Sequence, residues 1–140
     1  MRGRWILAIG IGIPLGAAAL LMYLFLFHDG RQGIDLAPWV APQSAYDSEM
    51  MPNPRWASDE LCDEDLPCIQ AVTSDTLTLY RFARREHAVD AAERFGHDGY
   101  LTGWIAVRYE PDGLTAAQRT EFEYGISCLN TWVGEEGQDC

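Results

Sequence analysis

The chain has 140 residues and a formal charge of −11, from 21 acidic and ten basic side chains. Arg2 and Arg4 are the only charged residues before Asp29, so residues 29–140 alone carry a formal charge of −13. This excess of negative charge repels phosphate groups, and it argues against a nucleic-acid partner and against a polybasic membrane-surface role.

Residues 5–27 read WILAIGIGIPLGAAALLMYLFLF, an apolar run without a charged side chain. A helix of this length extends about 34 Å, enough to cross a hydrocarbon core of about 30 Å. The alternative is a cleaved signal peptide, which has a shorter apolar core followed by a small-x-small cleavage site. The run instead ends in LFLFHDG. We therefore predict a transmembrane helix over residues 5–27, after a short N-terminus of residues 1–4.

The flanking charges predict the orientation of this helix. Arg2 and Arg4 precede the span, whereas Arg31 is the basic residue closest after it. The more positive side stays in the cytoplasm, so we expect a cytoplasmic N-terminus and a C-terminal domain outside the cell membrane. Ala8, Gly12 and Gly16 follow at four-residue spacing, which predicts a stripe of small residues that packs against an integral membrane partner. The alternative is that Gly and Ala are simply frequent in membrane helices.

Residues 28–57 contain four prolines and show no sustained hydrophobic period, which predicts an extended Pro-rich tether. Apolar side chains are scattered through it, and they cost free energy if they stay in water. We predict that Leu36, Trp39, Val40 and Trp56 contact a partner protein. The alternatives are contact with the membrane interface or with the external domain itself.

Residues 58–140 are predicted to form an α+β domain with the order β-β-α-β-α. Alternating and helical hydrophobic patterns place strands at residues 69–73, 76–82 and 100–109 and helices at residues 84–95 and 116–132. Thr115 and Gln118 match a capping box at the start of the second helix. We expect a sheet of about three strands with both helices on one face, and a right-handed parallel crossover through residues 76–109.

The four cysteines predict disulfide bonds, because an even number in a small exported domain favours them. Three pairings are possible, and we predict Cys62–Cys68 and Cys128–Cys140, each closing a short loop. A zinc site is the alternative, but structural zinc sites use gaps of about two to four residues between paired ligands. The gaps here are wider, so no metal or other cofactor is predicted.

No recognisable catalytic motif is present in the sequence. An enzyme would have to gather distant residues such as His87, His97 and Asp98, and neither a G-x-S-x-G signature nor a Gly-rich phosphate loop occurs. The chain is therefore not predicted to be an enzyme. We expect an accessory subunit or assembly factor of a larger membrane complex. The alternative is an extracytoplasmic module that binds a small ligand or cell-wall component, with Trp104 and Arg108 as contacts.

Overall fold

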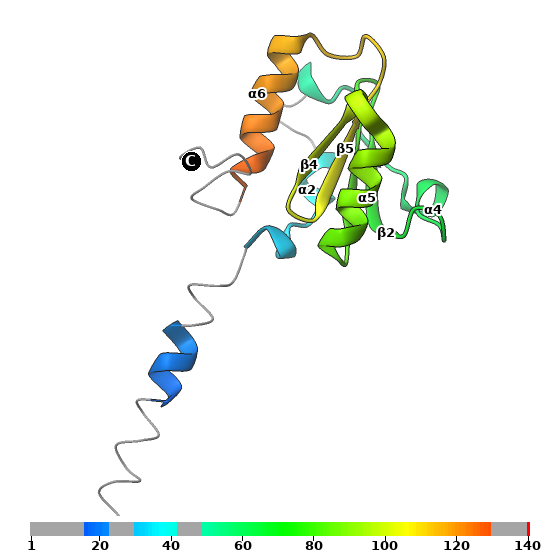
Figure 1. Ribbon diagram of the computed structural model, residues 1–140. Helices are drawn as coiled ribbons and strands as arrows, with labels where there is room; N and C mark the ends of the chain where they lie inside the picture. The colour runs from blue at the N-terminus through cyan, green and yellow to red at the C-terminus, as the bar shows by residue number, and fades with distance from the viewer. Residues whose placement is uncertain (1–15, 23–29, 42–48, 130–139) are drawn as a thin grey trace, which may run out of the picture.

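The computed structural model describes residues 16–22, 30–41, 49–129 and 140 (Figure 1). It confirms the α+β class, with a five-stranded antiparallel sheet in the order β1-β2-β3-β5-β4. The strands are β1 (Arg55–Trp56), β2 (Cys68–Thr73), β3 (Leu77–Phe82), β4 (Gly99–Thr102) and β5 (Ile105–Tyr109). The sheet is larger than the expected three strands, because β1 was not predicted and residues 100–109 form two strands.

The helices are distributed along the whole described chain. They are η1 (Gly30–Gly33), α2 (Ala37–Val40), α4 (Ser58–Leu61), α5 (Arg85–Phe95), η2 (Gly96–Asp98) and α6 (Ala116–Ser127). The predicted capping box is confirmed, because the Thr115 hydroxyl accepts from Gln118 N and the Gln118 side chain accepts from Thr115 N. α6 ends at Ser127, earlier than the predicted residue 132.

The predicted strand over residues 100–109 is instead a hairpin of β4 and β5. Thr102 and Ile105 are register partners on either side of a turn at Gly103, which has a φ of 57°. Glycine adopts this positive φ without strain, so the chain can reverse in the middle of an apolar run. Because β5 pairs with both β3 and β4, the crossover through α5 joins two parallel strands that are not neighbours.

The two long helices cover opposite faces of the sheet, which corrects the prediction that they share one face. Along β3, Leu77 and Leu79 belong to one buried cluster, and Tyr80 and Phe82 belong to another. Ile126 of α6 packs in the first cluster, whereas Ala88 and Ala91 of α5 pack in the second. Successive strand residues point to opposite faces, so a sheet with apolar residues on both faces needs two covering layers.

The described parts of the predicted tether form part of this core instead of extending from the domain. Ile34, Leu36, Met50 and Met51 are all buried in the cluster on the α6 face, and Leu36 has no exposed surface. β1 adds to the sheet by pairing with β2. Burial of these side chains removes the cost of leaving them in water, so the segment is structural despite its prolines.

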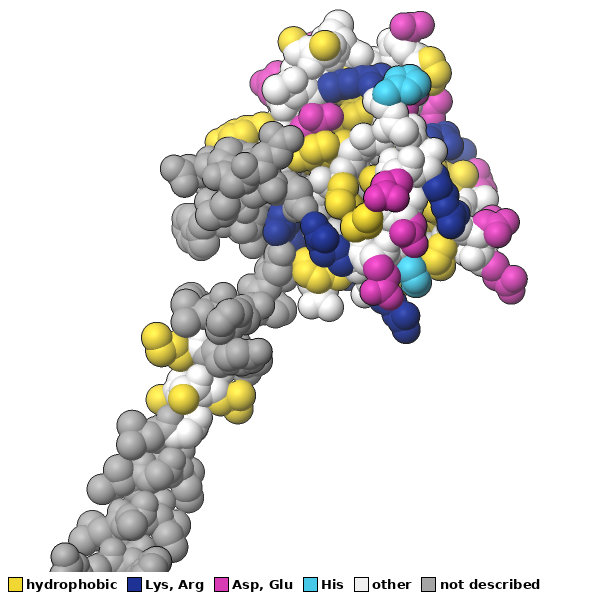
Figure 2. All heavy atoms as spheres, in the orientation of Figure 1, with side chains coloured by type: hydrophobic (Ala, Val, Ile, Leu, Met, Phe, Trp, Pro, Cys, Tyr) yellow, Lys and Arg dark blue, Asp and Glu magenta, His cyan; other side chains and the backbone are white. Residues whose placement is uncertain are grey.

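Most of the predicted membrane span lies outside the described residues. Residues 16–22 are helical, and Leu20, Leu21 and Met22 expose more than half of their surface. Figure 2 shows hydrophobic side chains, in yellow, on this segment. Within the described residues, no helix has both the length and the hydropathy that a membrane crossing requires.

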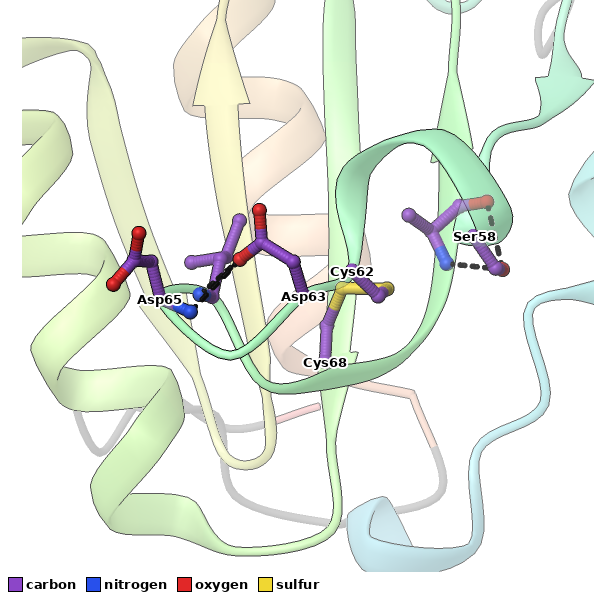
Figure 3. Close-up of a disulfide and its surroundings, with 7 residues drawn as sticks. Ser58, Cys62, Asp63, Asp65 and Cys68 are labelled. Carbon is purple, nitrogen blue, oxygen red and sulfur yellow. Dashed lines mark hydrogen bonds between the residues drawn. A yellow bond between two sulfur atoms is a disulfide. The ribbon is translucent and has the colours of Figure 1, made fainter.

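The predicted disulfide pairing is confirmed: Cys62 is bonded to Cys68, and Cys128 to Cys140. The first bond joins the residue after α4 to the first residue of β2 (Figure 3). The second attaches Cys140 to the residue that follows α6. The first bond thus fixes the loop after α4 to the start of β2.

Replacing Leu36 with Ala should lower the free energy of unfolding by about 2–5 kcal/mol, because it leaves a cavity in the core. Ile69→Ala is the matched control, since Ile69 exposes 47% of its surface, and it should cost less than about 1 kcal/mol. Chemical denaturation of the full chain in detergent measures both. Equal small effects would show that the segment around residue 36 does not belong to the folded unit.

Replacing both cysteines of either pair with Ser should destabilise the domain by about 2–3 kcal/mol, because each bond restricts the unfolded chain. Thermal denaturation of the oxidised protein and the two double variants measures the loss. Reduction of the wild type should lower its melting temperature below that of either variant. A double variant that melts at the same temperature as the oxidised wild type would show that the missing bond does not stabilise the domain.

Candidate functional site

A network of polar contacts, here called the latch, joins the N-terminal segment to the sheet. It consists of Asp35, Gln70 and Arg81 with the neighbouring backbone. Gln70 Nε2 donates to Asp35 Oδ1 at 2.8 Å, and Gln70 Oε1 accepts from Leu36 N at 3.2 Å. Arg81 Nη2 donates to Gln32 O at 3.0 Å. Gln70 and Arg81 are register partners on β2 and β3, so two central strands hold the segment.

Local chemistry places Asp35 and Leu36 in opposite environments. Asp35 Oδ1 accepts from Ala37 N at 3.0 Å, a side-chain turn that leads into α2, where Pro38 occupies the first turn. This directs the Leu36 side chain into the core and leaves the Asp35 carboxylate at the surface. The Ala37 N–H lowers the pKa of Asp35 most, followed by the Gln70 amide and, more weakly, the Arg81 charge.

Arg81 is only partly satisfied by these contacts. Its Nη1 lies 3.4 Å from Gln70 Oε1, while its buried Nε has no hydrogen-bond partner within the described part of the chain. An unsatisfied buried donor costs free energy. The Nε of Arg81 therefore stays without an acceptor among the described residues, while its Nη2 makes a charged hydrogen bond to the N-terminal segment.

The predicted partner-contact residues divide into two groups. Leu36 is buried, and Trp39 and Val40 are partly buried against the same cluster, so these three pack on the domain itself. Trp56 on β1 exposes 42% of its surface and lies apart from them at the edge of the sheet. Of the four, Trp56 has the largest surface available to another molecule.

The predicted helix-packing residues fall largely outside the structure. Ala8 and Gly12 lie outside the described residues. Gly16 begins the described helical segment, and a side-chain carbon added there would meet no atom within 4 Å. The stripe of small residues therefore remains a prediction from sequence.

Two hollows on the described surface are small. One, of about 270 Å³, lies beside Trp56 and is lined by residues 56–60. The other, of about 190 Å³, lies between the loop closed by the Cys62–Cys68 bond and α5, next to His87 and Arg94. Sites for small molecules usually enclose about 300–1,000 Å³, so both hollows suit a single side chain of a partner better than a whole ligand.

The acidic loop between Cys62 and Cys68 is shaped by its own carboxylate. Asp63 Oδ1 accepts from Asp65 N at 2.9 Å and from Leu66 N at 2.7 Å (Figure 3). Asp63 is thus occupied as a turn former. Over the described residues, no group of three or more His, Cys, Asp or Glu side chains is arranged to hold a metal ion.

Of the three residues considered for a catalytic site, the structure brings His97 and Asp98 into contact. His97 Nε2 lies 3.2 Å from Asp98 Oδ2, but His87 belongs to the first half of α5, whereas His97 follows its end. The second oxygen of Asp98 pairs with Arg119 of α6 at 3.3 Å. Asp98 therefore connects η2 to α6.

Arg119 also contacts the sheet, which gives this region a structural role. Its guanidinium lies 4.5 Å from the ring centre of Tyr109, and the Tyr109 hydroxyl donates to Glu123 Oε1 at 3.2 Å. Burial, followed by the Glu123 charge, raises the pKa of Tyr109 far above its usual range. The hydroxyl therefore stays protonated as a donor that holds α6 on β5.

Trp104 and Arg108, the predicted ligand contacts, do not form one site. Trp104 belongs to the β4–β5 turn, whereas Arg108 lies near the other end of β5 and pairs with Glu110 at 2.9 Å. The latch, by contrast, was missed by sequence reasoning. Two features of the sequence could have indicated it. Asp35 lies three residues before Pro38 at the start of a helix, and Gln70 is a lone Gln within an apolar strand.

The lowered pKa of Asp35 predicts an acid-sensitive latch. Its ionised form contributes stability at neutral pH, and this contribution is lost as the pH falls below about 3.9 and through the lowered pKa. The Ala37 amide chemical shift should therefore titrate with a midpoint below about 3.9. Asp35→Asn should abolish this step, and Arg81→Gln should raise its midpoint. A midpoint at or above the ordinary value would contradict the latch.

Comparison of the chain with protein-family models, with curated proteins and with solved structures finds no match in any of the three. The case for a function therefore rests on the described residues and on the chemistry of the sequence. Among them, the latch is the feature with a direct consequence for the whole chain, because it joins the domain to the segment that follows the predicted span.

Proposed function

We propose that the chain is a single-pass membrane protein whose external domain is held directly against the membrane as an interaction module. It serves as an accessory subunit or assembly factor of a larger membrane complex. The observation that carries this proposal is the packing of the segment that follows the predicted span. Ile34 and Leu36 are buried in the domain core, and the latch fixes the backbone around them.

This packing leaves little chain between the membrane and the domain. The predicted span ends at Phe27 and η1 begins at Gly30, three residues later. Three residues reach at most about 10 Å. The domain therefore stays beside the bilayer and follows the position of the membrane helix, so one partner can contact both.

The proposal assigns partner contact to two surfaces. Within the membrane, the stripe of Ala8, Gly12 and Gly16 allows close approach of another helix. Outside it, Trp56 provides an exposed aromatic side chain beside a hollow, and Trp is among the residues that contribute most to protein interfaces. Leu36, Trp39 and Val40 are no longer assigned this role, because they pack on the domain itself.

A module that binds a small ligand is the alternative, and the hollow beside Trp56 is the place for it. Its volume of about 270 Å³ accommodates an aromatic or aliphatic side chain of a partner. Because typical ligand sites are larger and more enclosed, protein contact is the better-supported use of this surface.

The test is gentle detergent extraction of native membranes that contain the C-terminally tagged chain, with native-gel sizing and mass spectrometry. A discrete complex of fixed stoichiometry is expected. Trp56→Ala should reduce recovery of the partner at least about fivefold, as for an interface hot spot. Gly12→Leu combined with Gly16→Leu should also weaken the complex, because larger side chains separate the helices.

Tyr124→Ala is the matched control, since Tyr124 exposes 52% of its surface on α6, away from β1. It should leave recovery of the partner unchanged. Recovery of the chain as a lone monomer or self-oligomer would overturn the accessory-subunit proposal and favour ligand binding. Loss with all three variants alike would indicate unfolding, which circular dichroism of the same samples detects.

A further inference from the structure

The hollow beside Trp56 is built on a short stretch of backbone that is fixed to the sheet. Ala57 N donates to Ala71 O at 2.9 Å, and Ser58 Oγ accepts from Ala71 N at 2.9 Å (Figure 3). The disulfide bond that begins at Cys62, directly after α4, fixes the other end of this helix to β2. The backbone around the hollow is therefore held in place before a partner binds, which lowers the entropic cost of binding.

An aromatic ring and two carboxylates line this hollow. They belong to Trp56, Asp59 and Glu60, and all three side chains are exposed. Glu60 is already paired, because its two oxygens accept from the two Nη atoms of Arg55 at 2.7 and 3.0 Å. Asp59 has no hydrogen bond or ion pair within the described part of the chain. The hollow therefore offers one unpaired negative charge together with an indole ring.

Negative charge predominates around the hollow after the neighbouring arginines are counted. Residues 55–65 contain five carboxylates and one arginine, and Arg94 adds one positive charge where it donates to Asp65 O. Arg81 and Arg84, at the end of β3 and before α5, each have a carboxylate of their own nearby. The excess of carboxylates extends over the domain, since residues 49–129 contain 15 carboxylates and seven arginines. This surface therefore favours a positively charged group over a negative one.

The domain itself contains an arginine that is held by an aromatic ring and a carboxylate. The guanidinium of Arg119 lies 4.5 Å from the centre of the Tyr109 ring, and it also pairs with Asp98 at 3.3 Å. A guanidinium is flat, so it can lie on an aromatic face while its N–H groups donate to a carboxylate. Trp56 and Asp59 provide the same two kinds of group on the open surface.

We propose that the hollow binds an arginine side chain of the membrane partner, with the guanidinium against the Trp56 ring and paired with Asp59. This inference rests on the proposed function and names the chemistry of the contact at Trp56. A volume of about 270 Å³ suits one long side chain, and indole attracts a cation more strongly than other aromatic rings do. The acidic surface also steers a basic partner toward the hollow.

The test is an NMR titration of the full chain in detergent micelles with two blocked peptides, acetyl-Gly-Arg-Gly-amide and the same peptide with citrulline in place of arginine. Citrulline has nearly the shape of arginine but no charge, so the comparison isolates the effect of the cation. The arginine peptide should shift the Trp56 indole N–H and the amides of residues 57–60. It should bind at least about fivefold more tightly than the citrulline peptide.

Two variants test the assigned contacts. Asp59→Asn removes the charge, and Trp56→Leu keeps an apolar side chain but removes the aromatic face. Each should weaken binding of the arginine peptide about two- to fivefold. Asp112→Asn is the matched control, because Asp112 is exposed in the loop after β5 and Asn tolerates its φ of 59°. It removes the same charge and should leave binding unchanged, and the amide spectra show that each variant is folded.

The outcomes separate this inference from the proposed function. Equal binding of the two peptides, or equal loss in Asp59→Asn and Asp112→Asn, would overturn the arginine contact and leave the accessory-subunit proposal in place. Tighter binding of tetramethylammonium than of the arginine peptide would replace the partner's arginine with a small ammonium ligand. Recovery of the chain as a lone monomer from native membranes would overturn the proposed function, and the partner's arginine with it.

Discussion

The structure depends on covering the apolar face of the sheet that Leu79 and Val107 share. α6 covers one part of this face with Ile126, and the segment before β1 covers another with Leu36 and Met51. Full burial of one such side chain contributes about 1.5–3 kcal/mol. The residues that follow the predicted span are therefore required to complete the core. The latch is the set of polar contacts at the surface beside this apolar packing.

The parts that sequence predicted correctly depend on local chemistry. The capping box at Thr115 is set by residues three apart, and the Cys62–Cys68 bond closes a short loop. Prediction failed where distant residues decide the structure. Proline content suggested a tether, but whether Leu36 stays in water is decided by a face built from β2, β3 and β5. Similarly, the alternation through residues 100–109 did not reveal the reversal at Gly103.

The candidate site was less predictable than the fold for the same reason. Asp35, Gln70 and Arg81 are brought together by strand register and by the return of the N-terminal segment to the sheet. None of the three belongs to a motif. The sequence predicted Trp56 and Leu36 together as contact residues, and only the structure separates the exposed Trp56 from the buried Leu36. The distribution of charge over the surface could not be predicted either, because a total of −13 does not reveal where the arginines lie.

Under the proposed membrane anchor, the shortness of β1 has a consequence for neighbouring copies of the chain. Confinement to a plane raises the local concentration of neighbouring domains, and an open sheet edge is a template for pairing between them. β1 offers only Arg55 and Trp56 at this edge, and Arg55 Nη1 donates to Trp56 O at 3.3 Å. The edge that bears the exposed tryptophan thus resists strand-to-strand aggregation while its aromatic side chain stays accessible.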